Sequence, residues 1–141
     1  MAIWFTDITV EELNLRSKNT LADCLEIIFT DVGHDTLTAT MPASAKTKQP
    51  IGIIHGGANV ALAETVASTA ANAVIDIEKS YCVGLEINAN HIRSVKSGIV
   101  TAITRPIHIG RSTQIWHIDI FDDNGRQTCI SRMTASVLQR L

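Results

Sequence analysis

The longest stretch of apolar and small residues runs from Gln49 to Asn72 and reads QPIGIIHGGANVALAETVASTAAN. A loop containing Pro and Gly reaches His55, two glycines follow, and the next residues carry one charged side chain, Glu64. Small or apolar residues occupy the helical neighbours of Glu64, which predicts a helix that is apolar almost all round and therefore buried. We expect this helix to run from the glycine pair to about Lys79.

Glu64 is the leading chemical candidate in this helix. An unpaired carboxylate in an apolar setting costs free energy or takes a raised pKa, and such groups are retained where they have a chemical role. Ser68 is its i+4 neighbour on the same helical face and could hold Glu64 or an attacking water in position. The alternative is a structural glutamate that is satisfied by Ser68 and backbone groups.

Shorter patterns predict the remaining elements. Thr9 followed by Glu12 fits a capping box, which predicts a helix from Val10 to Arg16. Another helical turn is expected at 21–25, and residues 3–8 are expected to form a short edge segment. Period-2 alternation predicts strands at 25–30, 36–41, 82–91, 98–109, 113–122 and 128–138, with hairpin turns at 32–35 and at 122–125.

This order of elements predicts the fold class. A single buried helix must be covered on most sides, and about six strands achieve this by curling an antiparallel sheet around it. We therefore expect an α+β fold with a curled antiparallel sheet around one long central helix, and not a parallel α/β fold. The length of 141 residues fits one domain spanning 1–141.

Composition and charge exclude several classes of function. Twelve basic and fourteen acidic residues form no run of either sign, which argues against a nucleic-acid partner. Three widely spaced cysteines and the lack of a signal peptide predict reduced thiols in a cytoplasmic protein, and the polar residues within the long helix argue against a membrane span. The five histidines lack metal-ligand spacing, and nucleophile-elbow and nucleotide-binding motifs are missing, so we expect no metal and no nucleotide cofactor.

The residues His55-Gly56-Gly57 begin the helix. Backbone N–H groups are free at a helix amino terminus and carry the positive end of the helix dipole, and glycines allow a ligand to approach closely. A thioester carbonyl oxygen directed at the Gly56 N–H would be stabilised as it gains negative charge, an effect of about 3 to 4 kcal/mol for one such donor. The alternative is that His-Gly-Gly serves only as a helix entry.

Several segments together resemble a known family. HGGANVALAE, with Gln49 six residues before His55, resembles the signature of hotdog-fold acyl-CoA thioesterases of the 4-hydroxybenzoyl-CoA thioesterase type. The segments TATMP at 38–42, TKQP at 47–50, VGLEINANHIRSVKSG at 83–98 and QIWHIDIFDDNGR at 114–126 resemble its bacterial branch that contains 1,4-dihydroxy-2-naphthoyl-CoA hydrolase. The resemblance covers nearly the whole chain.

The resemblance implies hydrolysis of an aromatic acyl-CoA, with 1,4-dihydroxy-2-naphthoyl-CoA in menaquinone biosynthesis as the leading substrate. Glu64 would be the nucleophile or general base and the Gly56 N–H the oxyanion donor, while His55 and Gln49 would position the reacting groups. Ser68 would orient water. The family's site lies between two subunits, which implies a homodimer or homotetramer, and CoA enters only as part of the substrate.

The resemblance also implies a site for the nucleotide end of CoA. It points to Asn90, His91, Ile92 and Arg93, to Gly110, Arg111 and Ser112, and to Val83 for the pantetheine channel. The Gly-Arg-Ser turn offers a flexible backbone, a cation and a hydroxyl for phosphate, although an exposed arginine in a turn is often only solvated. Glu86 is expected to be an outward strand residue or an interface partner.

Two alternatives stay open. The acyl group could instead be phenylacetyl or a medium-length chain, because pocket shape sets this choice. The domain could also be a non-catalytic acyl-CoA-binding module.

Overall fold

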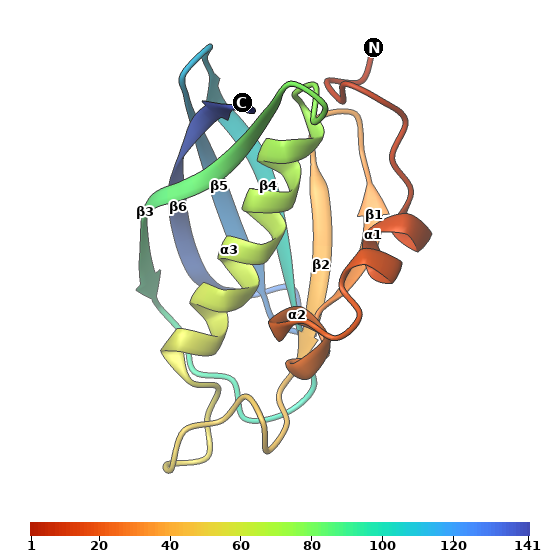
Figure 1. Cartoon of the computed structure of the whole chain (residues 1–141). Coiled ribbons are helices and arrows are strands. Elements are labelled where there is room, and N and C mark those ends of the chain that lie inside the picture. Colours follow the sequence, from red (N-terminus) through yellow and green to blue (C-terminus); the bar gives the residue numbers. More distant parts are fainter.

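The computed structural model describes residues 1–141 and contains one antiparallel sheet with a long helix packed on its concave face (Figure 1). The six strands lie in the order β1-β2-β4-β5-β6-β3. The predicted α+β hotdog arrangement is confirmed. The elements are α1 (Val10–Arg16), α2 (Leu21–Cys24), β1 (Ile28–Val32), β2 (Leu37–Pro42), α3 (Gly56–Ala73), β3 (Ser80–His91), β4 (Ile99–Ile109), β5 (Thr113–Phe121) and β6 (Gln127–Gln139).

Helix α3 buries only one of its faces, so the prediction of a helix buried all round was wrong. The face against the sheet carries small and apolar residues, with Leu62, Val66 and Ala70 completely inaccessible to solvent. The opposite face is half-buried and carries the polar residues Glu64, Thr65, Ser68, Thr69 and Asn72. The sheet curls around one side of the helix, and the periodicity of small alanines did not reveal which side would stay open.

The end of α3 was also predicted wrongly, because the helix stops at Ala73 and not near Lys79. Val74 and Ile75 are β-branched, which disfavours helix, and both pack against the core. The following turn is organised by Asp76, whose backbone oxygen accepts hydrogen bonds from the N–H groups of Lys79 (3.1 Å) and Ser80 (2.9 Å). This turn reverses the chain into β3.

A pair of side-chain hydrogen bonds attaches the end of α3 to β3. The Asn72 carboxamide accepts from the Cys82 N–H (2.8 Å) and donates to the Cys82 oxygen (3.2 Å). Strand β3 pairs with β6 along one side only and forms one edge of the sheet, shown in green in Figure 1. The backbone N–H and C=O groups on its other side are therefore free to pair with another strand.

The amino-terminal helices α1 and α2 lie beside α3, near the edge of the sheet formed by β1 (Figure 1). The predicted α1 is confirmed, and Thr9 Oγ1 accepts from the Glu12 N–H (3.2 Å) as expected of its cap. The predicted edge segment at 3–8 is wrong, since those residues form no strand. Strand β1 begins at Ile28 and not at Leu25, because Glu26 takes a left-handed conformation with φ of 57° that interrupts extended backbone.

No helix of the structure combines the length and the hydropathy that crossing a membrane requires.

Candidate active site

The first turn of α3 presents one unused backbone donor. His55 is the N-cap residue, and its Nδ1 accepts from the Gly57 N–H (2.8 Å), while its backbone oxygen accepts from Ala58 and Asn59 (2.9 and 3.2 Å). The Gly56 N–H donates to no group of the chain. A donor that stays free at the positive end of a helix dipole is suited to a developing negative charge.

A cavity of about 270 Å³ opens beside Gly56 and includes residues predicted from the resemblance. Gln49, His91 and Arg93 line it, and the His91 ring packs so closely that a β-carbon at Gly56 would lie 3.0 Å from its Nε2. The Arg93 guanidinium donates to the Gln127 oxygen (2.6 Å), which fixes the loop after β3. The cavity thus joins the helix entry to the end of β3.

Asn59 lines the same cavity and was not predicted from the sequence. Asn59 is 5% exposed, and its buried Oδ1 has no hydrogen-bond partner within the chain. No sequence pattern around Asn59 indicates that its side chain would be buried and unpaired beside a cavity.

Glu64 lies on the half-buried face of α3, not inside the core as predicted. Its carboxylate packs against Gly84 of β3, so closely that a β-carbon at Gly84 would overlap Oε1. The carboxylate takes part in no hydrogen bond or ion pair within the chain, and partial desolvation raises the pKa of Glu64. Ser68 lies one turn away without bonding to it. Gly84 was missed, although a glycine within a strand pattern indicates close approach of another group.

The free donor and the carboxylate are separated within one chain. A rise of about 1.5 Å per residue places Gly56 and Glu64 about 12 Å apart along α3. Gly56 faces the cavity with His91, whereas Glu64 faces a hollow lined by Gly84 and Leu85 and a larger groove on its other side. A single chain therefore does not direct both groups at one carbonyl.

The larger groove, here called the α1–α3 groove, has a volume of about 760 Å³ and lies between α3 and the amino-terminal segment. Glu64, Thr65, Ser68, Thr69 and Asn72 form its wall on α3. The facing residues come from segments far from α3 in the sequence, so no sequence pattern indicated the groove. They are Phe5, Thr6, Asp7, Ile8, Glu12, Leu13, Arg16, Ser17, Thr20, Leu21, Ala22 and Phe29, and the groove ends at Ala73 and residues 75–78.

The residues predicted to bind CoA fall at opposite ends of the sheet. Asn90, His91, Ile92 and Arg93 lie at the end of β3, beside Gly56. Gly110, Arg111 and Ser112 connect β4 to β5, and the Ser112 oxygen accepts from the Val137 N–H (2.9 Å), opposite the start of β3. The rise of a strand, about 3.3 Å per residue, puts the two ends of β3 more than about 25 Å apart. Val83 is exposed near the start of β3.

Other predicted features are peripheral. Glu86 is exposed and accepts hydrogen bonds from the Asn88 Nδ2 (3.1 and 3.3 Å), as expected of an outward strand residue. No three His, Cys, Asp or Glu side chains come together as a metal site.

A curled antiparallel sheet around one helix, with a free donor at the helix start and a carboxylate of raised pKa on its open face, defines a hotdog-fold thioester hydrolase. The chain belongs to the Thioesterase superfamily, whose family model matches residues 51–129. It is an acyl-CoA thioesterase.

Named relatives agree with this class. The chain is 46% identical to 1,4-dihydroxy-2-naphthoyl-CoA hydrolase of Escherichia coli, over 96% of this chain and 99% of that protein. It is 43% identical to the proofreading thioesterase EntH of Cronobacter sakazakii, over 96% of this chain and 98% of that protein. The crystal structure of a mutant thioesterase from Pseudomonas aeruginosa superposes with a TM-score of 0.97 at 43% identity, covering 99% of this chain and 100% of that one.

Proposed function

We propose that the protein hydrolyses aromatic acyl-CoA thioesters, with 1,4-dihydroxy-2-naphthoyl-CoA, an intermediate of menaquinone biosynthesis, as the leading substrate. The observation that carries this proposal is Glu64, whose carboxylate is unpaired and has a raised pKa, and which lines a groove large enough for an aromatic acyl group. The substrate itself is taken from the name of the Escherichia coli relative. CoA is part of the substrate, and no other cofactor is required.

In the proposed reaction, the bond between the acyl carbon and the CoA sulfur breaks, the CoA thiolate leaves, and water supplies the new oxygen of the acid. Glu64 either removes a proton from the water that attacks the thioester carbonyl, or attacks this carbonyl itself and expels the thiolate, which leaves a mixed anhydride that water then hydrolyses. A raised pKa suits a general base, since it brings the proton affinity closer to neutral pH. The Gly56 N–H stabilises the oxyanion, Gln49 and His55 position the carbonyl and the carboxylate, and Ser68 orients the water.

The separation of Gly56 from Glu64 supports a site shared between two subunits. We propose that β3 pairs antiparallel with β3 of a second copy, about a two-fold axis midway between Gly84 and His91. His91 of the partner subunit would then lie opposite Gly84. Because His91 packs on Gly56 and Gly84 packs on Glu64, Gly56 of the partner subunit would lie beside Glu64.

The same pairing supports the proposed CoA site. It would bring residues 90–93 of one chain towards Gly110, Arg111 and Ser112 of the other, because antiparallel self-pairing sets the end of one β3 against the start of its partner. Val83 would border the channel between them. Each active site and each CoA site would then draw on both subunits.

The exposed edge of β3 supports the dimer independently. Leu85 is 64% exposed, and Val83 and Tyr81 are also open to solvent on a strand with unpaired backbone groups. Leu85→Asp should therefore shift the protein to a monomer and abolish hydrolysis. Light scattering coupled to size-exclusion chromatography measures the mass, and Leu15→Asp, at an exposed position on α1, is the matched control.

The test of the reaction is hydrolysis of a thioester panel, followed with a thiol reagent. We expect the largest kcat/KM for 1,4-dihydroxy-2-naphthoyl-CoA, lower values for phenylacetyl-CoA and octanoyl-CoA, and at least about a hundredfold loss of kcat in Glu64→Gln with CoA binding retained. Glu11→Gln, on the exposed side of α1, should behave as wild type. Release of no CoA from any thioester would instead indicate a binding module.

Mixing two inactive variants tests the shared site. Glu64→Gln and Gly56→Pro remove the carboxylate and the N–H donor, respectively, so each homodimer should be inactive. If each site uses one group from each chain, heterodimers formed by unfolding and refolding an equimolar mixture regain one intact site. About a quarter of wild-type activity is then expected, since half of the dimers are mixed and each has one good site of two. No recovery would place both groups on one chain.

A second candidate is a proofreading thioesterase, the activity for which the Cronobacter sakazakii relative is named. Proofreading requires tolerance of many acyl groups, so it predicts similar kcat/KM values across the panel.

A further inference from the structure

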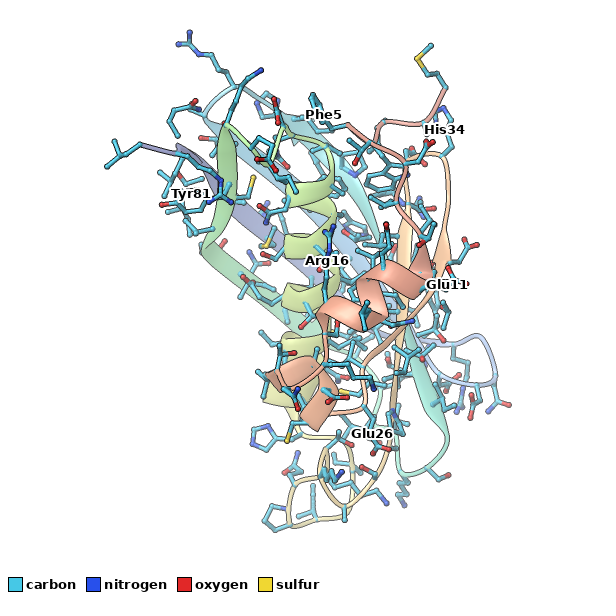
Figure 2. The ribbon with its side chains drawn as sticks, turned by 45° about the vertical axis from the view of Figure 1, so that its right-hand side comes forward. Phe5, Glu11, Arg16, Glu26, His34 and Tyr81 are labelled. Atoms are coloured by element: carbon cyan, nitrogen blue, oxygen red, sulfur yellow. The ribbon has the colours of Figure 1, made fainter.

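Arg16 is the only basic residue that lines the α1–α3 groove. It forms no hydrogen bond and no ion pair within the chain, although Glu12 lies one helical turn before it. In Figure 2, its side chain lies between α1 and the middle turns of α3. Arg16 is exposed, and its guanidinium therefore borders the groove with all of its donors available.

The helix that carries Arg16 is held firmly in place. Leu13 is 5% exposed and packs into the core, and the Asn14 carboxamide accepts from the Phe29 N–H (2.8 Å) and donates to the Phe29 oxygen (2.9 Å). The backbone of Arg16 is thus fixed relative to β1 while its head group stays free. An arginine whose backbone is fixed and whose guanidinium N–H groups are free is suited to ligand recognition.

The surroundings of Arg16 indicate the chemistry of the ligand. The groove has an apolar side formed by Phe5, Ile8 and Phe29, and hydroxyl groups of Thr65, Ser68 and Thr69 on α3. Its other charged residues are all acidic, namely Asp7, Glu12, Glu64, Asp76 and Glu78. This excess of carboxylates disfavours a strongly anionic acyl group, whereas a neutral ring with an oxygen substituent can accept from the guanidinium.

We infer that Arg16 determines specificity for the acyl group by binding an aromatic ring that carries a hydrogen-bond acceptor away from the thioester. The guanidinium donates to the ring oxygen and can also pack on the aromatic face. The inference rests on the proposed function, because Glu64 at the groove is taken to act on the thioester carbon. A hydroxylated aromatic acyl group places its thioester at Glu64 and its ring oxygen at Arg16. An aliphatic acyl group has no oxygen for Arg16 to bind.

The experiment compares Arg16→Met with wild type on 4-hydroxybenzoyl-CoA, benzoyl-CoA and hexanoyl-CoA. Loss of one charged hydrogen bond should lower kcat/KM for 4-hydroxybenzoyl-CoA about tenfold, with benzoyl-CoA less affected and hexanoyl-CoA within about twofold. Arg16→Lys should keep part of the preference for the hydroxylated ring. Lys18→Met is the control, because Lys18 pairs with Asp23 (3.3 Å) and does not line the groove.

Two results would overturn the inference. An equal loss on all three substrates would show that Arg16 acts only through the fold, and no loss on any would show that it does not contact the acyl group. If wild type hydrolyses no thioester, the proposed function fails, and calorimetric binding of the neutral probes 4-hydroxybenzamide and benzamide decides the role of Arg16. A preference for 4-hydroxybenzamide that disappears in Arg16→Met supports the inference, and equal affinities in wild type contradict it.

Discussion

The Glu64 carboxylate lies against the backbone of Gly84, so that a β-carbon at this position of β3 would overlap Oε1 unless the carboxylate moved. This contact joins the half-buried face of α3 to the edge strand of the sheet. It also sets the direction in which the carboxylate points, because Glu64 has no hydrogen bond within the chain to orient it. We therefore expect Gly84 to position the Glu64 carboxylate.

Gly84→Ala should lower kcat by about tenfold or more, because the new methyl group would displace the carboxylate from its place on β3. Its effect on KM and on the melting temperature should be smaller, since Gly84 is exposed and the far end of Glu64 can move. Steady-state kinetics and thermal melting measure the two effects. Glu11→Gln, on the exposed side of α1, again serves as the control. A Gly84→Ala variant with full kcat would contradict the role of Gly84.

Glu64→Gln should raise the melting temperature near neutral pH while it abolishes hydrolysis. Desolvation raises the pKa of Glu64 in the folded protein, so the ionised form costs stability at pH values above that folded pKa. As pH falls through the folded pKa, Glu64 becomes neutral and this cost disappears. The gain from Gln should therefore be largest at pH values above the folded pKa and shrink towards pH 4.5, the ordinary glutamate value. A gain that is independent of pH would point to packing instead.

Only one of the three cysteines should react with a thiol reagent in the native protein. All three are free, but Cys82 and Cys129 are buried, and burial raises the pKa of both thiols, that of Cys129 to about 11. Little thiolate then forms at about pH 8, and access is also blocked. Mass spectrometry after brief treatment with iodoacetamide should find label on Cys24 alone, and on all three after denaturation. Rapid native labelling of Cys129 would contradict its burial.

Asn14→Ala should destabilise the protein by about 1 to 3 kcal/mol, because it removes both hydrogen bonds to the backbone of Phe29 and leaves two part-buried groups unpaired. Denaturant unfolding measures the free energy. Asn124→Ala, in the exposed turn before β6, should cost much less. Asn14→Ala should also reduce the discrimination among acyl-CoA substrates, since α1 carries Arg16. An unfolding free energy equal to that of wild type would show that α1 is held by other contacts.

Several helices, strands and turns could be predicted from the sequence because residues close together in the chain specify them. The cap formed by Thr9 and Glu12 predicted α1, and the turn at 122–125 predicted the β5–β6 hairpin, in which Gly125 takes a φ of 74°. Alternation predicted β3 to β6 within about two residues at each end. The glycines after His55 and the lone charge of Glu64 marked the residues on which the proposed site depends.

By itself, then, the sequence determined the order of elements, the antiparallel class of the sheet and the candidate groups Gly56 and Glu64. Only the tertiary structure decided that α3 ends at Ala73, that Glu64 is half-buried, that Gly84 packs against it and that Arg16 lines the same groove. Local patterns record whether a position is apolar, but not which face the sheet will cover or which distant segment will pack opposite. The packing of β3, α1 and α3 made those choices.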